Sequence, residues 1–410
     1  MSTATSQPGT LSHATPGNHC YTRSELILIV ACIALATLTA FTISATISPP
    51  RVLYEENRID PLVFRAVGEL LAAERSPYSL TNQRQIIAAN RLDGEPPPYA
   101  IPFSYPPNAL PYFHLRSLGD PAVNAAVITS ISVLLSLLGL SQLVGRYVNN
   151  PLTRLTMVVT ASFWIPGILD MLLAQTGHLV AFLAFCILLC HDRKPVLAGI
   201  ALGLLAFKPH YAIPLALVAM SRGNWLLLIA AAIVFTASSL SSGLLYGWHL
   251  WVEFWSSATA LNPTVIHTEG WIGVAALLLP RSLEGLSDAA IPVYLSGMCL
   301  LALLLVVCRQ RMDTLSALAL ALALTILVSP NTHPYDMTVF YIPLLMLTRY
   351  FGMKMWITLA FFLVFLLPNI FVSLSVVRFV FLLSSCLAIV WIILSAGRHG
   401  LPADNPTANQ

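Results

Sequence analysis

Residues 26–47 read LILIVACIALATLTAFTISATI, a run of 22 residues that contains no charged side chain. A helix that crosses the hydrocarbon core of a bilayer needs about 20 predominantly apolar residues. The apolar core of a secretory signal peptide is shorter, at about 7–15 residues. The run therefore predicts a retained membrane-spanning helix, and this helix sets the expectation for the rest of the chain.

The composition extends this prediction to the whole chain. Hydrophobic residues make up 57% of the 410 residues, charged residues 10%, and the mean hydropathy is +0.77. Soluble domains carry about 25% charged residues, so the sequence predicts a polytopic membrane protein without a separate soluble catalytic domain. It has no glycine-rich nucleotide-binding loop, and its seven cysteines lack zinc-site spacing. We therefore expect no metal, no other cofactor and no nucleic-acid partner.

Further apolar segments follow the first, most of them separated by short joints. We predict an all-α fold in which residues 25–396 form one membrane domain between disordered termini at 1–24 and 397–410. Several segments are shorter than a full crossing requires, and two of them meet at Lys208-Pro209, which indicates a broken or re-entrant pair. The predicted helices cover about 25–47, 121–143, 155–172, 177–190, 196–207, 210–220, 225–245, 289–308, 314–329, 337–348, 355–369 and 377–396.

One long polar segment, residues 49–120, interrupts this pattern. It holds eight of the chain's 18 acidic residues. Within it, residues 64–73 (FRAVGELLAA) have helical periodicity and predict an amphipathic helix that lies at the membrane surface. The later prolines predict a stiff, extended chain. Because little else lies outside the bilayer, we expect the chemistry to take place here.

The basic residues predict the orientation. With the N-terminus in the cytoplasm, eleven Lys and Arg side chains fall on the cytoplasmic side and three fall opposite, in agreement with the positive-inside rule. With this orientation, residues 49–120 follow the first crossing and are predicted to be extracytoplasmic, in a multi-pass protein of the plasma or inner membrane. The basic residues of this segment do not contradict the orientation, because long segments are exempt from the rule. The cytoplasmic eleven are Arg23, Arg146, Arg154, Arg193, Lys194, Arg222, Arg309, Arg311, Arg349, Lys354 and Arg398.

Two polar islands between apolar helices are candidates for substrate contacts. Lys208 lies at a helix break, where an ammonium either extends to the interface or binds a partner such as phosphate. The second island, residues 329–336 (SPNTHPYD), contains His333 and Asp336. Turn chemistry explains Asp336. It does not explain His333, which could donate a hydrogen bond to a phosphate or a sugar hydroxyl.

Other candidates lie in or near the predicted extracytoplasmic segments. Asp60 precedes the predicted amphipathic helix, where a carboxylate is either solvated or available to a lipid-borne substrate. Tyr105 either stacks on a sugar or packs within the loop. Asp170, Gln175 and His178 are weaker candidates, since Asp170 near a helix end is also typical of an interfacial residue.

These stretches together resemble glycosyltransferase family 87, membrane glycosyltransferases of the GT-C class that include phosphatidylinositol-mannoside mannosyltransferases. One departure concerns the family's Gly-Gln-x-Asn pattern, for which this chain has Ala-Gln-Thr-Gly-His. The matching pieces, in family order, are Asp60 with Ser76-Pro-Tyr78, Phe103-Ser-Tyr-Pro-Pro107, Ala174-Gln-Thr-Gly-His178, residues 198–209 (AGIALGLLAFKP) and Ser329-Pro-Asn-Thr-His-Pro-Tyr-Asp336.

The resemblance implies a GT-C bundle of about 10–13 transmembrane helices. It also implies transfer of a sugar from a polyprenyl-phosphate donor to a lipid or glycan acceptor on the extracytoplasmic side. In GT-C enzymes an acidic residue in the first extracytoplasmic loop acts as the base, and Asp60 matches that position. Lys208, His333 and Arg65 would hold the departing phosphate, and a single displacement would invert the anomeric centre. Mannose is the sugar that the family suggests.

Two other classes of protein fit part of the pattern. A multi-pass transporter or lipid flippase would also have broken helices and a few intramembrane charges. However, the two halves of the chain show no evident repeat, and alternating access does not need a long structured first loop. A non-catalytic scaffold for envelope assembly would not need Asp60, Lys208 and His333 on one side of the membrane.

Overall fold

The computed structural model describes residues 21–47, 59–90, 103–259, 286–329, 333–351, 383 and 386–395. These residues are 84% helical, and they contain 15 α-helices and no strands. Within these residues, four helical segments are long and apolar enough to cross a membrane by length and composition: Arg23–Thr46, Val123–Tyr147, Pro151–Leu172, which consists of two successive helices, and Trp225–Tyr246. The predicted class, an all-α polytopic membrane protein, is therefore confirmed.

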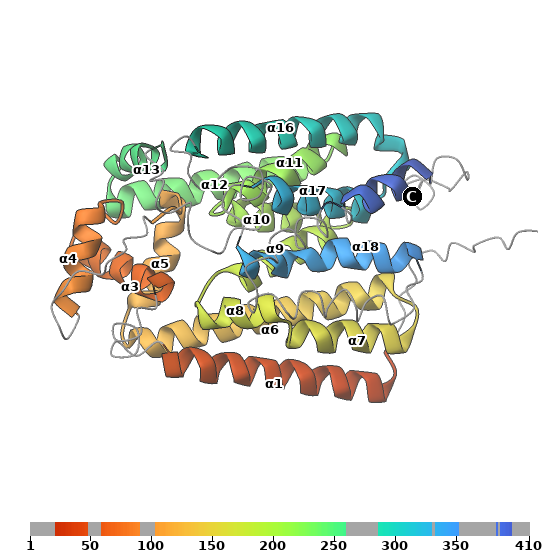
Figure 1. Ribbon diagram of the computed structural model, residues 1–410, viewed down its shortest axis with the longest axis horizontal. Helices are drawn as coiled ribbons and strands as arrows, with labels where there is room; N and C mark the ends of the chain where they lie inside the picture. The colour runs from red at the N-terminus through yellow and green to blue at the C-terminus, as the bar shows by residue number, and fades with distance from the viewer. Residues whose placement is uncertain are drawn as a thin grey trace, which may run out of the picture.

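The first long helix packs against the next two in the chain (Figure 1). Helix α1 (Arg23–Ile47) contacts both α6 (Pro121–Tyr147) and α7 (Pro151–Ser162). The single helix predicted at 155–172 is wrong in one respect, because the structure divides it into α7 and α8 (Ile165–Leu172). A proline within the first two positions of α8 accounts for the break, since proline cannot continue the hydrogen-bond ladder of a preceding helix.

Four helices joined by short turns follow: α9 (Gly177–Cys190), α10 (Pro195–Leu205), α11 (Pro209–Ser221) and α12 (Trp225–Tyr246). The bounds predicted for α9 are confirmed. The predicted break at Lys208 is also confirmed, because α10 ends at Leu205 and Lys208 caps α11. Added Cβ atoms at Gly199 and Gly203 would lie 2.3 Å and 2.6 Å from carbonyl oxygens of α12. Small residues thus let these two helices approach closely.

The last described helices are α16 (Leu286–Val307), α17 (Thr314–Val328) and α18 (Tyr341–Phe351). The helix predicted at 337–348 is wrong in its first third, because a 3-10 helix, η3 (Pro334–Phe340), precedes α18. The predicted helix 355–369 lies outside the described residues. Of the segment predicted at 377–396, residues 386–395 are described and helical.

Shorter helices gather at one end of the bundle, on the left in Figure 1. They are α3 (Ile59–Ala72), α4 (Leu80–Asn90), α5 (Leu110–Ser117) and α13 (His249–Thr259), with the 3-10 turn η1 (Pro107–Ala109). The amphipathic helix predicted at 64–73 is present but begins at Ile59, so Asp60 lies in the helix and not before it. The expectation of extended chain fails after Pro106, because proline is also well suited to the first position of a helix.

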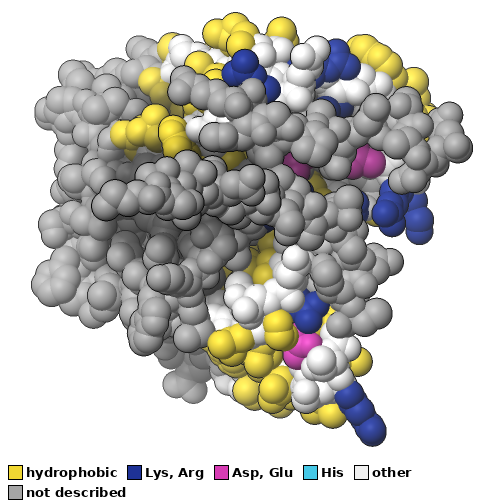
Figure 2. Space-filling view, turned by 90° about the vertical axis from the view of Figure 1, so that its right-hand side faces the viewer, with side chains coloured by type: hydrophobic (Ala, Val, Ile, Leu, Met, Phe, Trp, Pro, Cys, Tyr) yellow, Lys and Arg dark blue, Asp and Glu magenta, His cyan; other side chains and the backbone are white. Residues whose placement is uncertain are grey.

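The joints at the opposite end carry the basic residues. Asn224 Nδ2 donates to the carbonyl of His191 at 2.7 Å, Arg349 pairs with Asp313 at 2.5 Å, and Arg154 pairs with Glu25 at 3.0 Å. These contacts bring the predicted cytoplasmic joints together. Figure 2, which faces this end, shows Lys and Arg side chains together with Asp or Glu side chains on the described part of the surface.

Candidate active site

A buried ion pair links two joints that are distant in the sequence. Lys208 Nζ lies 2.8 Å from Asp336 Oδ1, and the two side chains are 6% and 2% exposed. Burial disfavours both charges, but each group offsets this cost for the other. The pKa of Lys208 is therefore raised above its ordinary value and that of Asp336 is lowered. Both residues lie at joints outside the four long apolar helices, and both are charged at neutral pH.

Local helix capping fixes the position of Asp336. The chain enters η3 at His333, and the backbone N–H of His333 donates to Asp336 Oδ2 at 3.0 Å. This reciprocal arrangement is a capping box, with Asp336 at the third helical position. The His333 ring stacks on Tyr335 at 5.1 Å between centroids. The capping box thus places His333 beside the ion pair.

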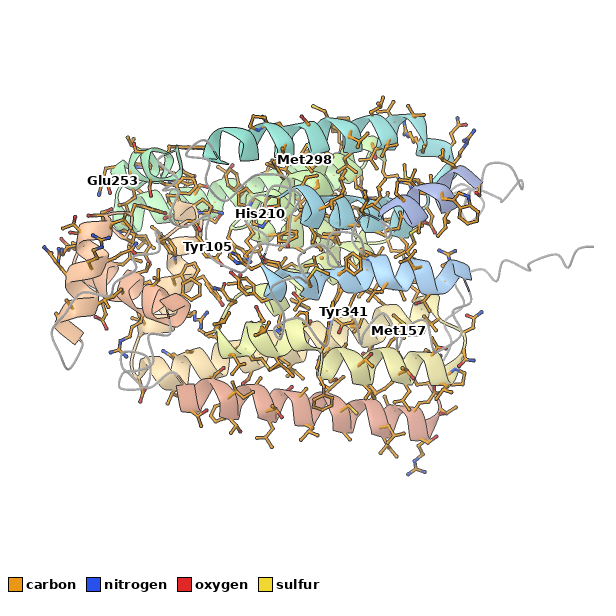
Figure 3. All side chains as sticks on the ribbon, in the orientation of Figure 1. Tyr105, Met157, His210, Glu253, Met298 and Tyr341 are labelled. Atoms are coloured by element: carbon orange, nitrogen blue, oxygen red, sulfur yellow. The ribbon has the colours of Figure 1, made fainter. Side chains whose placement is uncertain are left out.

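Tyr105 closes the other side of the pair. Its ring lies 5.9 Å from Lys208 Nζ, and the Tyr335 ring lies 5.6 Å from the same atom. The Tyr105 hydroxyl lies 3.3 Å from both Gln175 Oε1 and Thr176 Oγ1. The Lys208 ammonium therefore has one carboxylate and two aromatic faces around it. Figure 3 labels Tyr105 and the neighbouring His210, both in the half of the bundle nearer to α3, α4 and α5.

The turn between α8 and α9 is held by a second buried carboxylate. Asp170 accepts hydrogen bonds from the backbone N–H groups of Gly177 at 2.6 Å and His178 at 3.0 Å, and it lies 2.7 Å from His178 Nδ1. A carboxylate at a helix N-terminus stabilises the helix in this way. An added Cβ at position 177 would lie 2.6 Å from Asp170 Oδ1 and 2.7 Å from the carbonyl of Tyr335. The site therefore needs glycine there, and His178 serves to join Asp170 to α9.

The same turn contains a strained residue, and its backbone accepts a hydrogen bond from an arginine that the sequence did not indicate. Ala174 has φ +47°, a left-handed conformation that favours glycine. Arg116 Nη1 of α5 donates to the Ala174 carbonyl at 2.8 Å. This contact ties the first loop to the turn that carries Gln175. No motif surrounds Arg116, and the sequence of α5 (LPYFHLRS) is not distinctly apolar, so the sequence gives no signal for it.

Helix α3, which carries Asp60, docks on the aromatic cluster around Tyr105. The Phe64 ring lies 4.8 Å from Phe113 and 5.9 Å from Tyr105. Asp60 precedes Phe64 by about one helical turn, but its side chain lies outside the described part of the structure. Arg65 pairs with Glu69 at 2.8 Å along the same helix, and its hydrogen bonds do not reach Lys208 or Asp336.

His210 is a further polar residue beside the ion pair. It follows Lys208 in the first turn of α11, and its ring packs on Tyr211 at 4.5 Å between centroids. Its Nε2 atom is buried without a hydrogen-bond partner. The structure therefore gathers Tyr105, Gln175, Lys208, His333 and Asp336 in one place and adds His210 to them. For Arg65 the structure shows a pair with Glu69 on α3 and no hydrogen bond to this set.

A comparison with protein families matches residues 103–330 to glycosyltransferase family 87, which is more than half of the chain. The chain belongs to glycosyltransferase family 87. It is accordingly a membrane glycosyltransferase. The family match includes Tyr105, Gln175, His178 and Lys208, whereas Asp60 precedes it. No curated protein matches the chain.

Proposed function

We propose that this family 87 protein transfers a sugar, with mannose as the first candidate, from a polyprenyl-phosphate donor to a lipid or glycan acceptor. The reaction takes place on the extracytoplasmic side of the plasma or inner membrane, in a GT-C bundle. The observation that carries the proposal is the ammonium of Lys208, buried beside Tyr105 and Asp336 at a joint between apolar helices. A cation in this position suits a phosphate that is attached to a membrane lipid.

The transfer is a single displacement at the anomeric carbon. The acceptor oxygen forms a bond to this carbon while the bond from the carbon to the phosphate oxygen breaks. The bonding electron pair leaves with the polyprenyl phosphate, and the proton of the acceptor hydroxyl passes to the Asp60 carboxylate. Because the lipid phosphate is already a good leaving group, the reaction needs one base and a cationic site, but no general acid. The anomeric configuration is inverted.

Lys208 can serve this phosphate without losing its own partner. An ammonium has three N–H donors, and the carboxylate of Asp336 takes one of them. The others are left for the departing phosphate. His333, which is held beside Asp336 by the capping box, is the second donor to the phosphate. In this arrangement Asp336 orients Lys208 and reduces the cost of burying its charge.

The contacts between Tyr105 and the turn that follows α8 support a role for Tyr105 and Gln175 in sugar binding. The Tyr105 ring offers an aromatic face, and its hydroxyl is held by Gln175 and Thr176. Gln175 has an amide that can also bind a sugar hydroxyl. Arg65 pairs with Glu69 on α3 through Nε, and its Nη1 is buried without a hydrogen-bond partner; it is the third residue that we propose for the phosphate.

The proposal is tested by incubating the purified protein with a panel of donors: polyprenyl-phosphate mannose, other polyprenyl-phosphate sugars and the corresponding nucleotide sugars. Consumption of one lipid-phosphate donor, with release of polyprenyl phosphate, is expected. We also propose that the reaction needs no divalent metal, so activity should survive EDTA. Consumption of a nucleotide sugar in place of every lipid donor would overturn the proposed donor class.

A further inference from the structure

Arg116 is a buried cation without an anionic partner. It lies in the last turn of α5 and is 6% exposed. Two other Lys or Arg side chains are buried in the residues that the structure describes, and each pairs with a buried carboxylate: Arg154 with Glu25, and Lys208 with Asp336. Arg116 alone among these three has no ion pair.

The contacts of Arg116 neutralise its charge only in part. Nη1 donates to the Ala174 carbonyl at 2.8 Å and lies 3.5 Å from the Tyr112 hydroxyl. The guanidinium carbon lies 5.6 Å from the centre of the Phe64 ring and 5.7 Å from that of Tyr112. A carbonyl dipole and two ring faces are weaker partners than a carboxylate for a charge removed from water.

Part of the guanidinium remains available to a ligand. A guanidinium has five N–H donors in a planar fork, and the hydrogen bonds of Arg116 use Nη1 alone. Nε and Nη2 have no protein partner, and neither is among the fully buried polar atoms that lack one. Both atoms are therefore reachable. This fork matches two oxygens of a phosphate group.

Arg116 also borders the site described above. Tyr112, which contacts its guanidinium, stacks on Phe207 at 6.4 Å, and Phe207 stacks on Tyr105 at 6.2 Å. Ala174, which accepts its hydrogen bond, directly precedes Gln175. Because Lys208 lies over the Tyr105 ring, this row of three rings links Arg116 to Lys208. A phosphate bound at Arg116 would have its lipid chain next to the apolar helices.

We propose that Arg116 binds the phosphate of a lipid-linked substrate. The inference rests on the proposed function, because it assumes that this membrane glycosyltransferase takes a lipid phosphate. Arg116 supplies a full positive charge to the ligand, whereas the charge of Lys208 is already balanced by Asp336. The two guanidinium nitrogens fix the orientation of the phosphate. The bound phosphate is in turn the anionic partner that the buried guanidinium lacks.

The test measures the Kd of a short-chain polyprenyl monophosphate, and of inorganic phosphate, for the full chain in detergent. Arg116→Gln should weaken binding of the polyprenyl phosphate by about 10- to 150-fold, the loss expected for a hydrogen-bonded charge. Arg84→Gln is the control, because Arg84 is an exposed arginine of α4. The Kd of the polyprenyl phosphate for this variant should equal that for the wild type. Inorganic phosphate should bind more weakly than the lipid to every variant.

Unchanged binding by a folded Arg116→Gln variant overturns the inference and leaves the proposed function standing. If the wild type binds neither probe, the inference and the proposed donor fail together. Equal affinity of the wild type for the two probes would identify a free-phosphate site and contradict the lipid assignment. If Arg116→Gln does not fold, Arg116→Lys carries the test: it keeps the charge but lacks the planar fork, and a Kd equal to that of the wild type would overturn the inference.

Discussion

Removing one charge from the ion pair of Lys208 and Asp336 should destabilise the protein more than removing both. Lys208→Met leaves a buried carboxylate and Asp336→Asn leaves a buried ammonium, since the partners are only 6% and 2% exposed. Breaking a buried pair from one side costs about 3–5 kcal/mol of unfolding free energy. Each single variant should lose about this amount.

The double variant Lys208→Met with Asp336→Asn removes both charges. The asparagine oxygen can still accept from the backbone N–H of His333, as Asp336 Oδ2 does at 3.0 Å. We therefore expect the double variant to be more stable than either single variant, by about 1–3 kcal/mol. The double variant should nevertheless remain inactive in glycosyl transfer, because it lacks the Lys208 ammonium that binds the phosphate of the donor.

The assay is equilibrium unfolding of the four proteins in mixed micelles, with transfer from the lipid donor measured on the same samples. Strictly additive losses in the double variant would refute the reasoning, because additivity means that the two charges do not interact. A stable and fully active double variant would show that the pair is structural, and Lys208 would then have no role in donor binding.

Three further predictions concern Asp170, the pH dependence of the ion pair and the orientation in the membrane. Asp170→Asn should cost about 1.5–3 kcal/mol of stability, measured by the same unfolding assay, because three donors lose a charged acceptor. The contribution of the Lys208 and Asp336 pair to stability should be constant between about pH 4 and pH 10. It should be lost as pH falls through the lowered pKa of Asp336 or rises through the raised pKa of Lys208, and a slope at neutral pH would contradict this assignment. In a cysteine-free background, a cysteine at position 90 should react with an impermeant reagent in intact cells and one at position 150 should not; the reverse pattern would invert the orientation.

Apolar periodicity and local chemistry predict much of the fold. The bounds of α9 and the break at Lys208 could be predicted because glycine and proline mark those joints. The division between α7 and α8 is invisible to hydropathy, because both halves are apolar. The helix α4 was missed because its sequence (LTNQRQIIAAN) is mostly polar, although it packs on α3, its neighbour in the chain. The helix α13 was missed as well; it packs on α12 and on the distant turn η1.

The candidate site is predictable only in part. Lys208, His333 and Asp336 lie in polar islands between apolar helices, and that contrast identifies them. The pairing of Lys208 with Asp336 spans 128 positions, and no local pattern encodes it. Arg116 escaped notice because a single arginine in a loop helix is usually solvated, and only its burial in the folded chain makes it unusual.

The central claim is that Asp60 acts as the base in transfer from a lipid-phosphate donor. The most direct measurement is kcat of purified Asp60→Asn with polyprenyl-phosphate mannose, compared with Glu55→Gln and Glu56→Gln. Asparagine keeps the size of the side chain and loses most of its basicity, so kcat should fall by about 10²- to 10⁴-fold, while donor binding and both controls stay near wild type. Normal turnover by Asp60→Asn, with or without loss of activity in a control, would contradict the assignment of Asp60 as the base.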